Sequence, residues 1–305
     1  MLRQAKNICT IEGILAEQDI KYGSYIDKST GATVDNIGGT IKVLVNQTIN
    51  GEVVPMQIPI HMFSPRMTKK GTINPSYESI ERCMKEYKSI ASTGNIDTAD
   101  KVRITGGYVR MNEYYDTTGR FISFPRIHTS FVSRVTNNFQ PKASFEMEFA
   151  VSSMDFVTDA EGVEVDPKKL RIKVLVPYYG GKVDTIELFT VVPAAIDSIT
   201  TYWEEGKTYS AIGRLNFSST TREIVEEHDF GEPEIRTQTV SVSELLITGG
   251  STAPLEDGMA FEPAELAAAL KENKAYLESL KDKVNNRMKA TPAPTSFNQQ
   301  IDLGF

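Results

Sequence analysis

The chain has 305 residues, of which 40% are hydrophobic and 24% are charged, and its formal net charge is −7. These values are typical of a soluble globular protein, and the absence of any run of about 18 apolar residues excludes a membrane-spanning helix. The first residues lack a hydrophobic segment, so we expect no secretory signal and a cytoplasmic protein.

The first predicted elements are an opening strand over 8–17 and a long hairpin. The hairpin runs from Ile41–Val45 through Asn50-Gly51 into a strand over 53–60. An Asn-Gly pair between apolar runs is a strong hairpin signal, because both residues tolerate positive φ. This pattern predicts an antiparallel sheet at the start of the chain.

A helix over 76–89 follows, because Ile80, Met84 and Tyr87 recur at steps of four and three. Ser76 is the expected N-cap of this helix. Two further strands, over 101–110 and 128–135, complete a unit of five strands with a helix between the third and the fourth.

The second part of the chain repeats this plan. The pentapeptide at 41–45 recurs at 172–176 and leads through Gly180-Gly181 into a second hairpin. The strands expected for this copy lie at 144–156, 172–176, 183–189, 207–217 and 237–247. A helix between the third and fourth strands is the element order of an OB-fold. Two β-sandwich domains are the alternative, but the helix position favours the barrel.

The fold class that we expect is therefore mainly β, with two tandem five-stranded OB-like barrels, a C-terminal amphipathic helix and a disordered tail. The helix opens at Glu262-Pro263, and one apolar stripe is formed by Leu266, Leu270, Leu277, Leu280 and Val284. We expect this helix to pack on the second barrel, with self-association as the alternative. The expected units are 1–140, 141–258, 259–289 and 290–305.

Charge is divided unevenly between the two predicted barrels. Residues 1–140 contain 17 Lys/Arg and 13 Asp/Glu, a net charge of +4, whereas residues 141–250 contain 10 and 19, a net charge of −9. Local Lys and Arg residues, and not the average charge, make phosphate contacts. A polyanion would therefore meet the first barrel.

Catalytic motifs are missing from the sequence. It has neither a Walker-type phosphate loop nor a Gly-x-Ser-x-Gly elbow, so we expect no enzyme and no cofactor. Cys9 and Cys83 do not make a disulfide framework. His61, His128 and His228 share no metal-ligand spacing, and we expect them to be ordinary surface or core histidines. Acidic residues at 155–166 and 223–234 are interpreted as solvated loop charge.

Aromatic residues alternate with basic ones along the first predicted barrel. OB-folds bind single strands by stacking bases on aromatic rings while Lys and Arg follow the phosphates. One such segment, 21–28, is expected in the loop between strands one and two, and another, 63–70, in a basic loop after strand three. Phe121 and Phe124 are expected to flank a hairpin turn. The candidate nucleic-acid-binding residues are Lys21, Tyr22, Tyr25, Lys28, Phe63, Arg66, Lys69, Lys70, Tyr108, Arg110, Tyr114, Tyr115, Arg120, Phe121, Phe124, Arg126, Tyr178, Tyr179, Lys182, Arg214 and Phe217. For each aromatic residue, packing in a core or loop is the alternative.

The last residues form an apolar tip on a polar spacer. The spacer over 291–296 is rich in Pro, Ala and Thr and cannot bury a core, so we expect disorder there. The tip offers Ile301, Asp302, Leu303 and Phe305 with its terminal carboxylate to a partner that has an apolar pocket and a basic rim. A frayed terminus is the alternative.

In its tandem barrels and its C-terminal tip, the chain resembles phage-encoded single-stranded-DNA-binding proteins with tandem OB-folds. The resemblance implies a protein that coats transient single strands and recruits replication or recombination enzymes through the tip, without a cofactor. The tip has one acid, Asp302, where several are common in the family. A structural virion protein built of tandem β-domains is the alternative, and a metal-dependent nuclease is a third interpretation. Stacking and phosphate contacts do not read the 2′-OH, so RNA and DNA both stay open as ligands.

Overall fold

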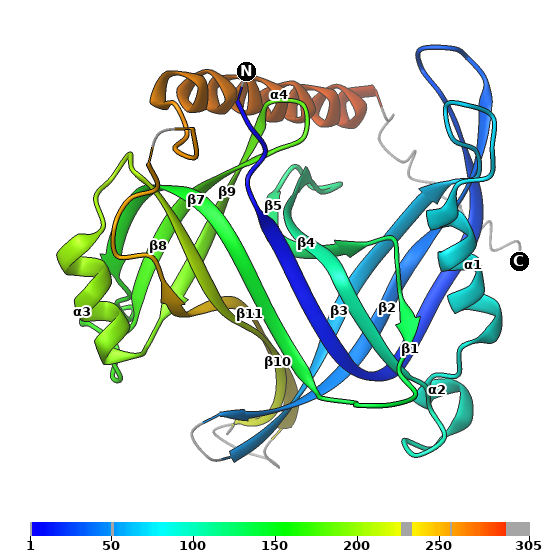
Figure 1. The fold of residues 1–305 in the computed structure, drawn as a ribbon, viewed down its shortest axis with the longest axis horizontal. Helices are drawn as coiled ribbons and strands as arrows, with labels where there is room; N and C mark the ends of the chain where they lie inside the picture. Colours follow the sequence, from blue (N-terminus) through cyan, green and yellow to red (C-terminus); the bar gives the residue numbers. More distant parts are fainter. Residues whose placement is uncertain (1, 50–51, 227–233, 257, 291–305) are drawn as a thin grey trace, which may run out of the picture.

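A computed structural model describes residues 2–49, 52–226, 234–256 and 258–290 (Figure 1). The described chain is mainly β, and its strands form one 11-stranded sheet. The strands are β1 (Asn7–Ile26), β2 (Thr33–Ile49), β3 (Glu52–Pro65), β4 (Lys101–Tyr115), β5 (Phe121–Thr129), β6 (Ser133–Arg134), β7 (Lys142–Phe156), β8 (Leu170–Tyr178), β9 (Lys182–Thr190), β10 (Thr208–Glu226) and β11 (Glu234–Gly250). The helices are α1 (Pro75–Glu86), α2 (Ile90–Thr93), α3 (Pro193–Tyr202) and α4 (Pro263–Ala290).

The first five long strands close into a barrel. Their order is β1-β2-β3-β5-β4, and β1 also pairs with β4, which closes the ring. β3 and β5 run parallel, while the other neighbours are antiparallel. The helix α1 lies between β3 and β4 in the chain, as the sequence predicts. The OB-like fold class is confirmed for this half.

The second half repeats the same closure. Its order is β7-β8-β9-β11-β10, β7 also pairs with β10, and β9 runs parallel to β11. The helix α3 occupies the place of α1. Each half has an irregularity at the same point of its first strand, between Leu15 and Glu17 in β1 and between Val151 and Ser153 in β7. A β-bulge of this kind bends a strand so that it can take part in a small barrel.

The two barrels join through their first strands. β1 pairs with β7 in antiparallel register, with Cys9 opposite Phe145. These two residues are also equivalents in the repeat, because Cys9 lies opposite Gly107 of β4 and Phe145 lies opposite Gly213 of β10. A pair of equivalent residues at the centre of an antiparallel ladder makes the junction locally two-fold. Because β1 pairs with β7, one sheet includes strands from both halves of the chain. The division of the chain into two units at residue 140 stays a prediction.

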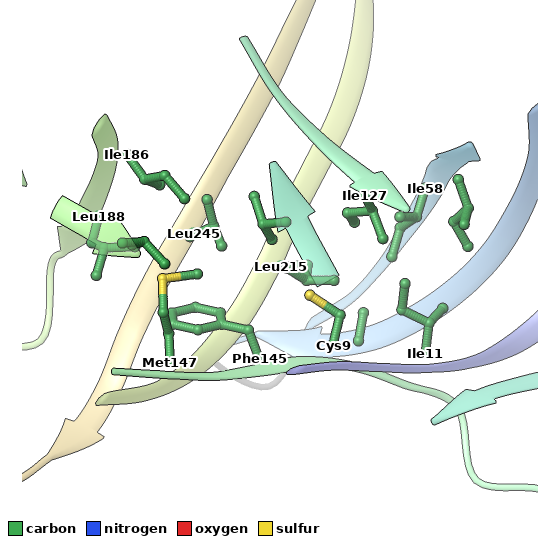
Figure 2. Close-up of a cluster of buried hydrophobic side chains, with 14 of the residues drawn as sticks. Cys9, Ile11, Ile58, Ile127, Phe145, Met147, Ile186, Leu188, Leu215 and Leu245 are labelled. Atoms are coloured by element: carbon green, nitrogen blue, oxygen red, sulfur yellow. The ribbon is translucent and has the colours of Figure 1, made fainter. Parts of the chain in front are cut away.

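The same side of the joined sheet supplies both barrel interiors, and their buried side chains form one hydrophobic cluster. Figure 2 shows Cys9, Ile11 and Ile58 of the first barrel in one buried cluster with Phe145 and Met147 of the second. Phe145 packs so closely on β10 that a Cβ atom at Gly213 would lie 2.5 Å from its ring. Glycine at this position therefore permits the close approach of β10 to β7.

Several predicted boundaries are wrong. Asn74 caps α1 through its side chain, which accepts a hydrogen bond from the Ser76 amide, so Ser76 is not the N-cap. The strands are also longer than predicted. β1 continues to Ile26 and includes Tyr22 and Tyr25, where a loop over 21–28 was expected. β3 likewise includes Phe63.

The last strand of the first unit was also misplaced, because β5 begins at Phe121 and not near residue 128. The turn before it is fixed by Asp116, whose side chain accepts hydrogen bonds from the amides of Thr118 and Arg120. Phe121 and Phe124 therefore both lie on β5 and do not flank a turn.

The helix α4 crosses above both barrels (Figure 1). It begins at Pro263, as predicted, and packs against β9 of the second barrel, but it also contacts β4 of the first. Leu266 is buried, while Leu270, Leu277, Leu280 and Val284 are half-buried. The apolar stripe therefore faces the two barrels, with its best-buried end at the start of the helix.

Candidate nucleic-acid interface

A row of ring side chains crosses the outer face of the first barrel. Tyr108 of β4 stacks on His128 of β5, with ring centroids 5.5 Å apart and an interplanar angle of 16°. His128 in turn meets His61 of β3 edge-on at 5.2 Å. The three residues are direct neighbours across the sheet, since β4, β5 and β3 pair Tyr108 with His128 and His128 with His61.

The row continues along β3 to the tip of β1. Phe63 lies two residues beyond His61, on the same face of the strand, and its ring centroid is 6.3 Å from that of Tyr25. We call Tyr25, Phe63, His61, His128 and Tyr108 the aromatic ribbon. Tyr25, Phe63 and Tyr108 are 43%, 47% and 40% exposed, so their ring faces are available to a planar ligand.

The two histidines of the aromatic ribbon were not among the predicted site residues. They are 67 positions apart in the chain, and the parallel pairing of β3 with β5 brings them together. A local signal did exist, because His61 lies two residues before Phe63 and His128 two residues after Arg126, which is the spacing of one strand face.

Both imidazoles are neutral at neutral pH. Burial, the neighbouring His61 and then two arginines lower the pKa of His128 to about 4. Burial and Arg126 lower the pKa of His61, although a hydrogen bond with the Gly39 backbone opposes this. At neutral pH the pair can therefore offer uncharged rings for stacking.

This lowering predicts a pH-dependent stability. In the unfolded chain the histidine pKa values are near 6.5, so as the pH falls the unfolded chain takes up these protons at a higher pH than the folded chain does. The free energy of unfolding is therefore highest above about pH 6.5 and decreases as the pH falls towards 4. We expect the thermal midpoint of His128→Phe to fall less than that of the parent between about pH 7 and pH 5. Parallel midpoint-against-pH curves for the two proteins would contradict this.

Tyr22 lies on the opposite face of β1 from Tyr25. Its hydroxyl donates a hydrogen bond to Glu81 of α1 at 2.6 Å, and its ring lies 6.5 Å from that of Tyr77. Since the two tyrosines differ by three positions on one strand, they point to opposite sides. The sequence grouped them together, but only Tyr25 belongs to the aromatic ribbon.

Two arginines occupy neighbouring places beside the aromatic ribbon but are held differently. Arg110 and Arg126 are directly opposite on β4 and β5. The Nε of Arg110 lies 2.5 Å from an oxygen of Asp184, and its guanidinium lies 3.1 Å from the ring centroid of Tyr178. Arg126 makes no ion pair with any described residue and lies 5.9 Å from the Phe124 ring. Arg126 is therefore the better placed of the two to contact a phosphate.

This difference predicts which arginine contributes to salt dependence. We expect Arg126→Gln to reduce the slope of log affinity for a single-stranded oligonucleotide against log salt by about one, as the loss of one phosphate contact does. Arg82→Gln, an exposed site on α1, makes the same charge change away from the aromatic ribbon and should leave the slope unchanged. Equal slopes for Arg126→Gln and the parent would exclude the contact.

The remaining predicted cations are spread over several strands and loops of both barrels. Lys21 pairs with Asp19 at 2.9 Å and Arg66 with Asp35 at 3.6 Å, both in exposed positions. Five others are exposed and take part in no ion pair within the described ranges: Lys28, Lys69, Lys70, Arg120 and Lys182. These five can attract phosphate by charge, although their long side chains are not fixed by a partner.

The aromatic residues at the β4–β5 tip divide between the two faces of the hairpin. Tyr115 packs against Phe121, with ring centroids 5.2 Å apart, on the face that continues the barrel interior. Tyr114 and Phe124 occupy the opposite face, which is shared with Tyr108 and Arg126. Only this second pair extends the outer surface that contains the aromatic ribbon.

The second barrel has different residues at the equivalent positions. The strand pairings of β3, β4 and β5 can be superposed on those of β9, β10 and β11. His61 then corresponds to Phe189, Arg126 to Glu244 and Tyr108 to Arg214. Glu244 forms an ion pair with Lys169, whose ammonium lies 4.8 Å from the Phe189 ring. A carboxylate therefore replaces the free guanidinium of the first barrel.

The same face of the second barrel is partly covered. A cleft of about 650 Å³ lies between it and the β4–β5 hairpin, and Glu113, Glu187 and Glu244 contribute to its lining. Burial raises the pKa of Glu113, and its side chain also hydrogen-bonds with Asn273 of α4. Lys173 also lines the cleft, 4.0 Å from Glu187, so its lining has three carboxyl groups and one ammonium group. A surface with this excess of acidic groups attracts phosphate less than the first barrel does.

Phe217 is a wrong prediction, because it is only 5% exposed and belongs to the core of the second barrel. It shares the inward face of β10 with Tyr209, Ala211 and Leu215, at alternate positions. Arg214 lies on the outer face and is half-buried, and its Nε has no hydrogen-bond partner in the described structure. The tip residues Ile301, Asp302, Leu303 and Phe305 lie outside the described residues.

Among the described residues, no group of three or more His, Cys, Asp or Glu side chains is arranged to hold a metal ion. Within the same ranges, no helix combines the length and the apolarity that crossing a bilayer requires.

Solved structures similar to this chain include two of the single-stranded DNA binding protein from Thermus aquaticus. The wild-type protein has 10% identity and a TM-score of 0.47, and the match covers 83% of this chain and 95% of that one. A deletion mutant of the same protein, which also has one arginine replaced by alanine, has 11% identity and a TM-score of 0.46, covering 83% and 97%. A replication protein A heterotrimer bound to single-stranded DNA matches at 8% identity and a TM-score of 0.20, covering 92% and 70%. TM-scores this low do not define the function of the present chain.

No curated protein matches the sequence. The family model described as YorF matches residues 6–283. The match extends from the first strand through most of α4 and so includes both barrels. The chain therefore belongs to the YorF family.

Proposed function

We propose that this protein binds single-stranded DNA without sequence specificity, through the outer face of its first barrel. The observation that carries the proposal is the aromatic ribbon, in which exposed rings from β1, β3 and β4 lie on one surface. Every base has a flat face, so such a surface stacks bases of any sequence. Duplex DNA hides those faces and offers only its phosphates and groove edges.

Charge supports the same assignment. The first 140 residues have a net charge of +4, and Arg126 adjoins the aromatic ribbon without an ion-pair partner among the described residues. The equivalent surface of the second barrel has Glu244 in that place. The first barrel therefore makes most of the nucleic-acid contacts, and we expect the protein to act by binding and protecting strands without turnover.

Retention on immobilised oligo-dT tests this function. The parent protein is retained at low salt and is eluted as the salt concentration rises, because phosphate contacts are lost through counterion competition. A structural virion protein made of tandem β-domains has no reason to be retained. Failure to bind oligo-dT at low salt would therefore contradict the proposal and favour that alternative.

We propose that the protein acts in DNA replication or recombination and recruits its partner enzymes through the C-terminal tip. The tip lies outside the described residues, so this proposal is tested by deleting it. Deletion of residues 291–305 should leave folding intact, because a Pro/Thr/Gln-rich terminus contributes no core. The affinity for DNA should be unchanged or slightly higher, since the carboxylate of Asp302 competes with phosphate for basic residues. Capture of a partner enzyme from a lysate should be lost.

Phe305→Ala should cause most of that loss. Burying a phenylalanine stabilises a complex by roughly 1.5–3 kcal/mol, which corresponds to about a tenfold to hundredfold change in affinity. Parallel pull-downs with the parent, the deletion and Phe305→Ala measure this. Identical partner sets for all three proteins would show that the tip recruits nothing.

A further inference from the structure

A pocket of about 230 Å³ opens where the first barrel meets the second. It is lined by the chain entering β1, by β4, and by the end of β8 with the turn after it. The lining residues that matter here are Gln4, Asn7, Tyr108, Tyr178 and Tyr179. Pockets for drug-sized ligands have about 300–1,000 Å³, so the space suits one planar ring system and not a larger ligand.

The walls of this pocket are fixed before any ligand enters. Asn7 exchanges hydrogen bonds with the backbone of Val109, donating at 2.7 Å and accepting at 3.0 Å. Tyr178 lies under the Arg110 guanidinium, which Asp184 holds by a 2.5 Å ion pair. A preformed site loses little conformational entropy on binding.

The rim of the pocket has two exposed aromatic side chains. Tyr108 is 40% exposed and is also the last member of the aromatic ribbon, while Tyr179 is 85% exposed. Tyr179 precedes Gly180 and Gly181, whose φ values of 85° and 71° form the tight turn between β8 and β9. No hydrogen bond holds the Tyr179 hydroxyl within the described structure. An exposed ring on a tight turn is available for stacking.

We infer that this pocket is a subsite for one unpaired nucleobase, through which a bound strand passes from the aromatic ribbon to the second barrel. The inference rests on the proposed function. Tyr108 links the two surfaces because it belongs to both, and Tyr179 closes the pocket from the second barrel. Within the described chain no carboxylate lines this pocket, and the nearby charge of Asp184 is paired with Arg110. The second barrel thus contacts DNA at this turn, although its own outer face is acidic.

Photochemical cross-linking with an iodouracil-containing oligo-dT tests the subsite directly. The expected result is an adduct on the peptide that contains Tyr178 and Tyr179, identified by mass spectrometry, alongside adducts on the aromatic ribbon. Tyr179→Ala should lower the affinity for the oligonucleotide by about fivefold to 100-fold, as the loss of one stacked base does. Tyr276→Ala removes a 58% exposed tyrosine from α4 and is the matched control, with unchanged affinity expected.

The outcomes separate this inference from the proposed function. If the parent binds oligo-dT but cross-links only at the aromatic ribbon, and Tyr179→Ala binds like the parent, the subsite is overturned while the function stands. If the parent binds no oligonucleotide, both are overturned. Cross-linking with an iodouracil mononucleotide distinguishes a subsite for a bound strand from a separate site for free nucleotides. Labelling of Tyr179 by the mononucleotide that oligo-dT does not suppress would overturn the strand subsite.

Discussion

The double variant Phe63→Ala/Tyr108→Ala should bind single-stranded oligonucleotides about 30-fold more weakly than the parent, or worse. Each substitution removes an exposed ring from the aromatic ribbon, and the loss of a base stack costs about 1–3 kcal/mol. Two stacks therefore cost at least about 2 kcal/mol, which sets the 30-fold limit. The affinity is measured by fluorescence polarisation at a single fixed salt concentration.

The control for this variant is Tyr202→Ala/Tyr276→Ala. It also removes two aromatic side chains, which are 55% and 58% exposed and belong to α3 and α4, outside the aromatic ribbon. We expect its affinity to equal that of the parent. If both double variants lose affinity equally, the effect is not specific to the aromatic ribbon and the assignment of the surface is wrong.

The largest effect on stability should come from Phe145→Ala, which we expect to lower the free energy of unfolding by about 3–5 kcal/mol. Phe145 is 3% exposed and lies opposite Cys9 at the junction of the two barrels. The cavity left behind would lie against Gly213, which has no side chain to fill it. Because folded proteins are stable by about 5–15 kcal/mol in total, this loss should be evident in urea titration.

Phe131→Ala provides the comparison, since an exposed phenylalanine contributes little to the core and its loss should change stability by no more than about 0.5 kcal/mol. An equal shift of the urea midpoint for Phe145→Ala and Phe131→Ala would mean that the junction is not a packed core. Two separate urea transitions for Phe145→Ala would instead show that the two barrels no longer unfold together.

The sequence predicted both barrels because their signals are local. The pentapeptide at 41–45 recurs at 172–176, and Gly180-Gly181 marks a turn that the structure contains, with positive φ at both glycines. The helix between the third and fourth strands was also predicted correctly in the first half, although its N-cap was not. These features depend on residues within a few positions of one another.

The contacts that define the candidate site join residues far apart in the chain. Arg110 and Asp184 are 74 positions apart, and their ion pair removes a charge that the sequence assigned to phosphate. His61 and His128 meet only because β3 and β5 run parallel. Nothing in the local sequence reports such pairings, since they are set by the closure of the barrel.

Phe217 illustrates a different limit of local patterns. Both faces of β10 carry apolar residues, and Ile212 is 54% exposed while Phe217 is buried. Alternation alone therefore does not tell which face is inward. The decision depends on packing against β7 and β11, which only the folded structure supplies.

The central claim is that exposed rings on the first barrel stack on unpaired bases. Its most direct test is a fluorescence-polarisation titration with one single-stranded oligonucleotide and a duplex of the same length and sequence, at two salt concentrations. We expect tighter binding of the single strand at both salt concentrations, with both affinities falling as salt rises, because stacking needs unpaired bases and phosphate contacts do not. Equal affinity for the single strand and the duplex would contradict the claim.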